Sequence, residues 1–254
     1  MPQNTLSSAS YVKAQYNQTN VLKNRISIYQ YAQQKETWHN WVYRHLPLKP
    51  HTTILEVGCG TGLLWQDKHI SQTLLLSDRS RAMVASCKKL YKPLIRMDVN
   101  TPAIRPHTID CLIANHLLYH LPDPTQTLAT LRKLLKPNGT FIASTHSKYH
   151  LDELISLLPA IFPEYNAIKR KPQGFYIETG KDLLQQYFNQ VDVYTFNNPL
   201  RVPTVESLIQ YTHTLFAGIQ VKHMAEKQAA LTETIKAKGM PFSLTSISGM
   251  FICR

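Results

Sequence analysis

Alternating apolar runs and amphipathic stretches along the chain predict an α/β fold. The apolar runs typical of buried strands lie at residues 54–57, 73–76, 94–97, 109–115 and 140–145. Between them lie predicted helices that start near Leu63, at the N-cap Ser80 and over residues 127–135. Strands that alternate with helices indicate a parallel sheet with right-handed crossovers.

The pattern is looser on both sides of this region. Helical spacing covers residues 11–46 before the first strand. Beyond residue 150, the predicted helices are at about 151–158, 180–188, 205–216 and 223–236, and the strands are at 191–196 and 243–253. We therefore expect a helical extension or lid over residues 1–48. One α/β domain follows over residues 49–254, with a helical insertion around 203–240 that builds a cap.

Composition supports an ordinary globular protein of 254 residues, because 43% of the residues are hydrophobic and 17% are charged. Apolar stretches are too short to span a membrane, and the first residues lack the basic and apolar regions of a secretory signal. The four cysteines form no C-x-x-C pair, so we expect reduced thiols and no metal site. The expected location is the cytoplasm.

The net charge of +12 brings nucleic acid into consideration as a partner. The basic residues are dispersed along the chain. A solvated basic surface is therefore the favoured interpretation, and nucleic acid stays a possible but less favoured partner.

The most informative stretch is ILEVGCGTG at residues 54–62, an apolar strand that runs into three glycines. Glycines let the backbone turn sharply and approach a ligand closely, as nucleotide-binding loops require. The G-x-G-x-x-G dinucleotide pattern is not met, because Leu63 stands where the third glycine would fall. The phosphate-binding pattern G-x-x-x-x-G-K-[ST] is absent from the sequence.

Polar residues gather at the carboxyl ends of the predicted strands, where open parallel sheets bind ligands. They are Glu56 with the glycines, Asp78, Asp98, Asn115 with His116, and His146. Each acid alone could be a turn former or helix cap. Two acids at successive strand ends after this loop favour a nucleotide-type site.

These motifs resemble those of the class I S-adenosylmethionine-dependent methyltransferases, most strongly over residues 35–150. LEVGCGTG is similar to their glycine loop, LSDRS and RMDVN to the two strand ends that follow, and LKPNGTFIAST to a later turn and strand. IANHLLYHLPD, LLW and the ETG turn at residues 178–180 resemble a small-molecule branch typical of ubiquinone and menaquinone biosynthesis. The resemblance implies a Rossmann-like, seven-stranded, mostly parallel sheet with helices on both faces.

The resemblance also implies a cofactor, S-adenosylmethionine, with S-adenosylhomocysteine as product. Gly58, Gly60 and Gly62 would approach its methionyl part, and Glu56 would face its ammonium through water. Asp78 would accept hydrogen bonds from the ribose hydroxyls, and Asp98, with Val99 beside it, would accept one from the adenine amino group. The candidate cofactor contacts are completed by Cys59, Arg79, Met83, Asn115, Tyr16 and Arg25.

Three of these candidates have open alternatives. Arg79 could instead hold the 2′-phosphate of a nicotinamide cofactor, which the second acid, Asp98, disfavours. Tyr16 and Arg25 in the leading helical segment could close over the cofactor, or could belong to a surface helix face.

Methyl transfer needs alignment and, where the acceptor carries a proton, a general base. The candidate catalytic residues are His116, Tyr119 and His120, just after the fourth predicted strand. Each could instead be a packed or hydrogen-bonded wall residue.

The favoured acceptor is a small molecule in an enclosed pocket. The alternative is RNA, against which stands the absence of the N-P-P-Y-type motif, since NHLL occupies its place. A cofactor-binding protein without turnover is the third hypothesis. The pattern does not predict the methylated atom or the oligomeric state.

Overall fold

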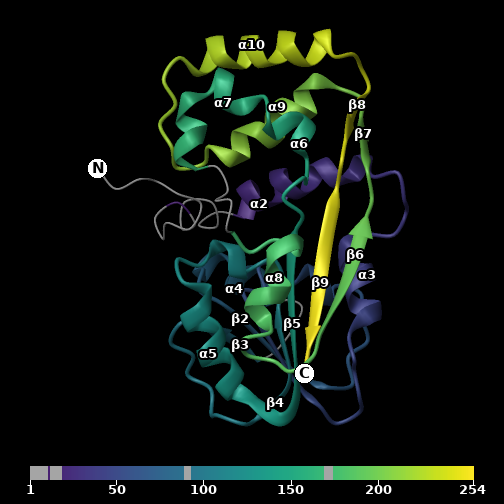
Figure 1. Cartoon of the computed structure of the whole chain (residues 1–254), viewed down its shortest axis with the longest axis vertical. Helices are drawn as coiled ribbons and strands as arrows, with labels where there is room; N and C mark the ends of the chain where they lie inside the picture. Colours follow the sequence, from purple (N-terminus) through teal and green to yellow (C-terminus); the bar gives the residue numbers. More distant parts are fainter. Residues whose placement is uncertain (1–10, 12–18, 89–92, 169–173) are drawn as a thin grey trace. The chain divides into compact units, whose positions relative to one another are not determined.

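A computed structural model describes residue 11 and residues 19–88, 93–168 and 174–254. The chain forms two compact units, each assembled from three segments (Figure 1). The first comprises Glu36–Ser147, Gln173–Phe196 and Ser248–Arg254. The second comprises Met1–Lys35, Lys148–Pro172 and Asn197–Ile247.

The first unit contains a seven-stranded sheet with the strand order β3-β2-β1-β4-β5-β9-β6. The strands are β1 (Thr53–Val57), β2 (Thr73–Asp78), β3 (Leu94–Arg96), β4 (Ile109–Ala114), β5 (Leu135–His146), β6 (Val191–Asn197) and β9 (Ile247–Cys253). Neighbours from β3 to β5 pair in parallel, and β9 runs antiparallel to β5. The predicted Rossmann-like, mostly parallel sheet is confirmed.

Side chains alternate between the two faces of this sheet, and helices cover both. From β1, Leu55 and Val57 pack into a core cluster with residues of α5 (Pro124–Leu134) and α8 (Ile177–Leu184). Ile54 packs into the opposite cluster, with residues of α3 (Trp38–His45) and α4 (Arg81–Cys87). Because both faces are covered, the strands are near-continuous apolar runs, which explains why they could be located from the sequence.

Local signals set the helix boundaries. Ser80 caps α4 as predicted, since its hydroxyl accepts a hydrogen bond from the Met83 backbone N–H. The helix expected from Leu63 shortens to the 3₁₀ turn η2 (Leu63–Trp65), and Asp67 then takes a left-handed φ of 59° that no helix continues. The turn expected in LKPNGTFIAST, at Pro137–Gly139, lies inside β5, where the pairing with β4 shifts register.

Gly180, in the ETG turn noted in the sequence, allows α8 to lie against β9. A Cβ added there would lie 2.6 Å from Cζ of Phe251, well inside van der Waals contact. The glycine therefore has a packing role in the sheet unit.

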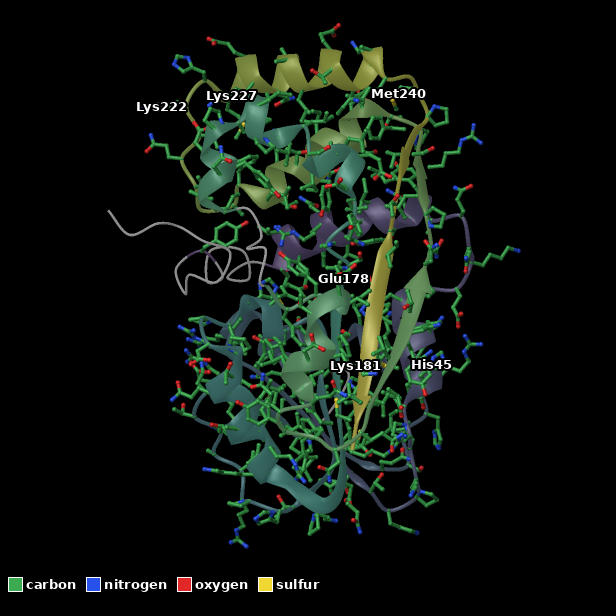
Figure 2. The ribbon with its side chains drawn as sticks, in the orientation of Figure 1. His45, Glu178, Lys181, Lys222, Lys227 and Met240 are labelled. Atoms are coloured by element: carbon green, nitrogen blue, oxygen red, sulfur yellow. The ribbon has the colours of Figure 1, made fainter. Side chains whose placement is uncertain are left out.

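Residues 36–48 belong with the sheet, which differs from the predicted boundary after residue 48. Trp41 and Val42 of α3 are buried in a core cluster of the sheet unit. The Trp41 ring lies 5.4 Å from the Phe196 ring of β6, and the His45 ring, labelled in Figure 2, lies 5.4 Å from Tyr194. Apolar contacts to a distant strand, which spacing along the chain does not reveal, decide where this helix packs.

The second unit is mainly helical and has its own apolar core. Its elements are α2 (Thr19–Ile26), η1 (Ser27–Tyr31), α6 (Asp152–Ile155), α7 (Leu158–Ile161), η4 (Pro163–Ala167), β7 (Leu200–Val202), α9 (Val205–Leu215), α10 (Met224–Ala237) and β8 (Phe242–Leu244). Helix α9 contacts both α2 and α10, and β7 pairs antiparallel with β8. The predicted insertion over 203–240 thus shares a core with segments before and after residues 36–147.

An ion pair ties two segments of the second unit together. The Lys227 ammonium, labelled in Figure 2, donates to the Glu164 carboxylate at 2.7 and 2.8 Å, and the Lys222 backbone N–H donates to the same carboxylate. These hydrogen bonds lower the pKa of Glu164, against an opposing effect of burial. Among the described helices of the whole chain, none has the length and apolarity that a membrane crossing requires.

Candidate active site

The glycine loop connects β1 to η2 through left-handed backbone conformations. Gly58, Gly60 and Gly62 have φ values of 69°, 57° and 77°, which side-chain-bearing residues rarely adopt. The Cys59 backbone N–H donates to the Ser77 carbonyl at 2.9 Å, and the Gly60 N–H donates to the Asp78 carboxylate at 3.0 Å. The loop is therefore fastened to the carboxyl end of β2.

Asp78 is the acceptor that holds both neighbouring turns. One carboxylate oxygen accepts from Gly60, and the other accepts from the Ser80 backbone N–H at 2.7 Å. Burial raises the pKa of Asp78, while these backbone hydrogen bonds oppose the rise. Each oxygen has a further lone pair, so the carboxylate fits a ligand with two adjacent hydroxyls, such as a ribose.

Asp98 lies just after β3, the next strand of the sheet. One of its oxygens accepts from the Asn100 backbone N–H at 2.9 Å and from the Asn100 amide at 3.0 Å. The other lies 3.7 Å from Nε of Arg79, whose side chain is 62% exposed. Arg79 thus pairs with an acid, which disfavours the nicotinamide 2′-phosphate interpretation. Asp98 forms its own turn and still presents a carboxylate at the strand end.

Apolar side chains lie beside these acids in the sequence and in the structure. Met83 is fully buried on α4, and Val99 and Cys59 are also buried. They therefore provide apolar packing close to the strand ends.

Glu56 is a buried acid on β1, and its carboxylate accepts a hydrogen bond from Nε1 of Trp65 at 2.6 Å. Burial raises the pKa of Glu56 to about 8, against the lowering effect of the Trp65 hydrogen bond, and the nearby Cys87 and Asp78 raise it further. A positive charge placed near such an acid favours its ionised form. Trp65 belongs to the LLW motif noted in the sequence. Its hydrogen bond to Glu56 could not be predicted there, because the two side chains meet only in the folded loop.

The Asn115 side chain makes hydrogen bonds that hold neighbouring elements together at the end of β4. Its carbonyl oxygen accepts from the Ser144 hydroxyl at 2.5 Å and from Nε1 of Trp38 at 3.3 Å. The Ser144 hydroxyl in turn accepts from the His116 backbone N–H at 2.9 Å. Asn115 therefore aligns β4, β5 and α3, and the position of its carboxamide is set by protein contacts.

The three candidate catalytic residues come together after β4, and a fourth joins them. Tyr119 lies with its ring 4.3 Å from His120 and 6.0 Å from His116. His146, at the end of β5, stacks on His116 with ring centroids 4.3 Å apart, and its Nδ1 is 2.9 Å from the Ser248 hydroxyl of β9. The sequence placed His146 at a strand end without a role, because the partner on β9 is distant along the chain.

The two candidates from the leading segment lie elsewhere. Tyr16 is outside the described residues. Arg25 belongs to the second unit, where its guanidinium donates to the Thr214 carbonyl at 2.6 Å and to the Thr214 hydroxyl at 3.2 Å. A cofactor contact for either residue stays a prediction.

Comparison with solved structures gives the same fold. A phosphoethanolamine N-methyltransferase 2 from Haemonchus contortus, solved in complex with S-adenosyl-L-methionine, superposes with a TM-score of 0.54 at 13% identity. The match covers 92% of this chain and 56% of that one.

Comparison with curated sequences finds methyltransferases. A malonyl-[acyl-carrier protein] O-methyltransferase from Halalkalibacterium halodurans is 33% identical over 105 residues, covering 36% of this chain and 38% of the relative. A ubiquinone biosynthesis O-methyltransferase from Photobacterium profundum is 28% identical over 131 residues, covering 48% of this chain and 53% of the relative. The matches thus span only about a third to a half of these relatives.

A family model described as "Methyltransferase domain" matches residues 29–187, which is more than half of the chain. The matched range contains the glycine loop, both strand-end acids and the histidine cluster. The resemblance identified from the motifs is confirmed, and the chain belongs to the methyltransferase-domain family.

Proposed function

We propose that this protein is an S-adenosylmethionine-dependent methyltransferase that acts on a small-molecule acceptor. The observation that carries the proposal is the Asp78 carboxylate, which fastens the glycine loop to the end of β2 and keeps lone pairs for two hydroxyls. Membership of the methyltransferase-domain family and the names of the curated relatives support it.

The strand ends supply a matching partner for each part of the cofactor. Asp78 accepts from the ribose hydroxyls, and Asp98 accepts from the adenine amino group with Val99 and Met83 as apolar neighbours. Glu56 balances the ammonium of the methionyl part, and the glycines allow the loop backbone to approach it. The bound cofactor supplies the methyl group on a positively charged sulfur.

The chain's contribution to the reaction is alignment and proton handling. His116 or His120 accepts the proton of the acceptor, and Tyr119 lines the same cluster. His146, held by Ser248, supports the His116 ring by stacking on it. This arrangement suits an acceptor atom that carries a proton, such as a hydroxyl oxygen.

RNA is the less favoured acceptor class. The two named relatives are described as a malonyl-[acyl-carrier protein] O-methyltransferase and a ubiquinone biosynthesis O-methyltransferase, and neither description names a nucleic acid. Filter binding tests this choice: salt-sensitive RNA binding in the submicromolar range would favour RNA.

Replacing Asp78 by Asn tests the ribose site. The substitution removes the charge and puts an amide NH2 against one of the two N–H groups, of Gly60 or Ser80, so we expect affinity for S-adenosylhomocysteine to fall by about tenfold to hundredfold. Calorimetry measures it. Asp110→Asn is the matched control, because Asp110 lies at the start of β4 and accepts from Thr53 and Lys136. Wild-type affinity in Asp78→Asn would contradict the assignment.

The pKa of Glu56 predicts a pH-dependent affinity. The free protein holds Glu56 protonated below about pH 8, and a bound ammonium favours the carboxylate, so binding should release a proton near neutral pH. Affinity for S-adenosylhomocysteine should therefore rise by up to about tenfold per pH unit between about pH 6 and 7.5. Calorimetry in buffers of different ionisation enthalpy measures the released proton.

Glu56→Gln is the control for this effect, since it keeps the shape of the side chain without the titrating proton. It should abolish most of the proton release and flatten the pH profile. Equal proton release in wild type and Glu56→Gln would show that another group titrates.

Alanine substitutions test the general base. A panel of small phenols, carboxylic acids and amines is first screened for an acceptor that the wild-type protein methylates. With that acceptor, His116→Ala or His120→Ala should lower kcat by about a hundredfold or more. Affinity for S-adenosylhomocysteine should stay the same, and the exposed His69→Ala is the control. Near-normal turnover in both variants would rule out a histidine base.

A further inference from the structure

Two of the four cysteines lie together beside the glycine loop. Cys59 stands between Gly58 and Gly60, and Cys87 is the last residue of α4. Their thiols are close enough to shift each other's pKa, and both are buried and reduced. Two cysteines that are 28 positions apart in the sequence thus lie together at the glycine loop, which is the proposed cofactor-binding loop.

Both thiols also lie within hydrogen-bonding distance of the same backbone atom. Sγ of Cys87 lies 3.3 Å from the Gly60 carbonyl oxygen, and Sγ of Cys59 lies 3.9 Å from it. The N–H of Gly60 is held by Asp78 on the other side. The two thiols therefore hold the carbonyl side of Gly60, and the Asp78 carboxylate holds its N–H side.

The four thiols differ in their surroundings. The hydrogen bond from Cys59 lowers the pKa of Cys87, against an opposing effect of burial, while the same pairing raises the pKa of Cys59. Burial raises the pKa of Cys111 to about 12 and also raises that of Cys253. The pKa of Cys87 is thus shifted toward the thiolate, the form that reacts with an oxidant, whereas the pKa values of Cys111 and Cys253 are shifted away from it.

We propose that Cys59 and Cys87 form an oxidisable dithiol, a modification site through which a peroxide weakens cofactor binding. Formation of the disulfide is independent of the proposed function, whereas its effect on affinity rests on it. The class of reagent is a two-electron oxidant, with a dithiol reductant to reverse the change.

The chemistry balances in two steps. The Cys87 thiolate attacks one oxygen of the peroxide, forms an S–O bond and breaks the O–O bond, which yields a sulfenic acid and, after protonation, water. The Cys59 sulfur then attacks the sulfenyl sulfur, forms the S–S bond and expels a second water, and the thiol proton leaves with it. Both sulfurs are oxidised, and one hydrogen peroxide is reduced to two waters.

Oxidation removes the donors on which the Gly60 carbonyl depends. A disulfide has no S–H group, so this carbonyl loses its thiol donors, while the Gly60 N–H stays bonded to Asp78. The S–S bond also requires its own geometry from the loop and the end of α4. A less well-held loop binds the cofactor more weakly.

The test treats the full-length protein with hydrogen peroxide, alkylates it under denaturing conditions and maps its peptides by mass spectrometry. We expect a cross-linked peptide that joins Cys59 to Cys87 and lacks two hydrogens, with Cys111 and Cys253 alkylated. Affinity for S-adenosylhomocysteine, measured by calorimetry, should fall by about fivefold to tenfold and recover after a dithiol reductant.

Two variants control the measurement. In Cys87→Ser, which cannot form the disulfide, peroxide should leave that variant's own affinity unchanged, whereas Cys253→Ser should keep the wild-type response. The absence of the cross-link, a cross-link without a change in affinity, or an equal loss in Cys87→Ser would each overturn the proposal. Reduced wild type that fails to bind S-adenosylhomocysteine would overturn the proposed function, and the peptide map would still decide the thiol pairing.

Discussion

The site depends on one carboxylate that joins two turns. Asp78 ends β2, and its oxygens accept from Gly60, in the loop after β1, and from Ser80, at the start of α4. Because β1 and β2 are parallel neighbours, their carboxyl ends meet at one edge, and a single acid can reach both turns. The glycines make this possible, since only residues that tolerate positive φ follow such a path.

The electrostatics around this carboxylate suit a cationic ligand. Glu56 and Asp78 both have a raised pKa, chiefly because they are buried, and the charge of Asp78 adds to the rise at Glu56. Neighbouring acids that resist ionisation gain from a positive charge placed near them. A sulfonium compound with an ammonium group, as in the proposed cofactor, carries two such charges, whereas a dinucleotide carries negatively charged phosphates.

Much of the sheet unit could be predicted because its signals are local. The strands are apolar on both faces, the glycine loop is contiguous, Asp78 ends β2 and Asp98 lies two residues after β3. Packing between distant segments could not be predicted in this way. Helix α3 joins the sheet through Trp41 and Phe196, Asn115 is held by Trp38 and Ser144, and His146 is held by Ser248. The second unit likewise collects three separate segments around one core, which no single stretch of sequence encodes.

A crystal structure of the protein with S-adenosylhomocysteine is the most direct test of the cofactor site. We expect the ribose hydroxyls within hydrogen-bonding distance of the Asp78 carboxylate, with the adenine beside Asp98 and the ammonium facing Glu56. A ligand bound away from the carboxyl ends of β1, β2 and β3, or one that leaves Asp78 without a ribose contact, would contradict the proposed site.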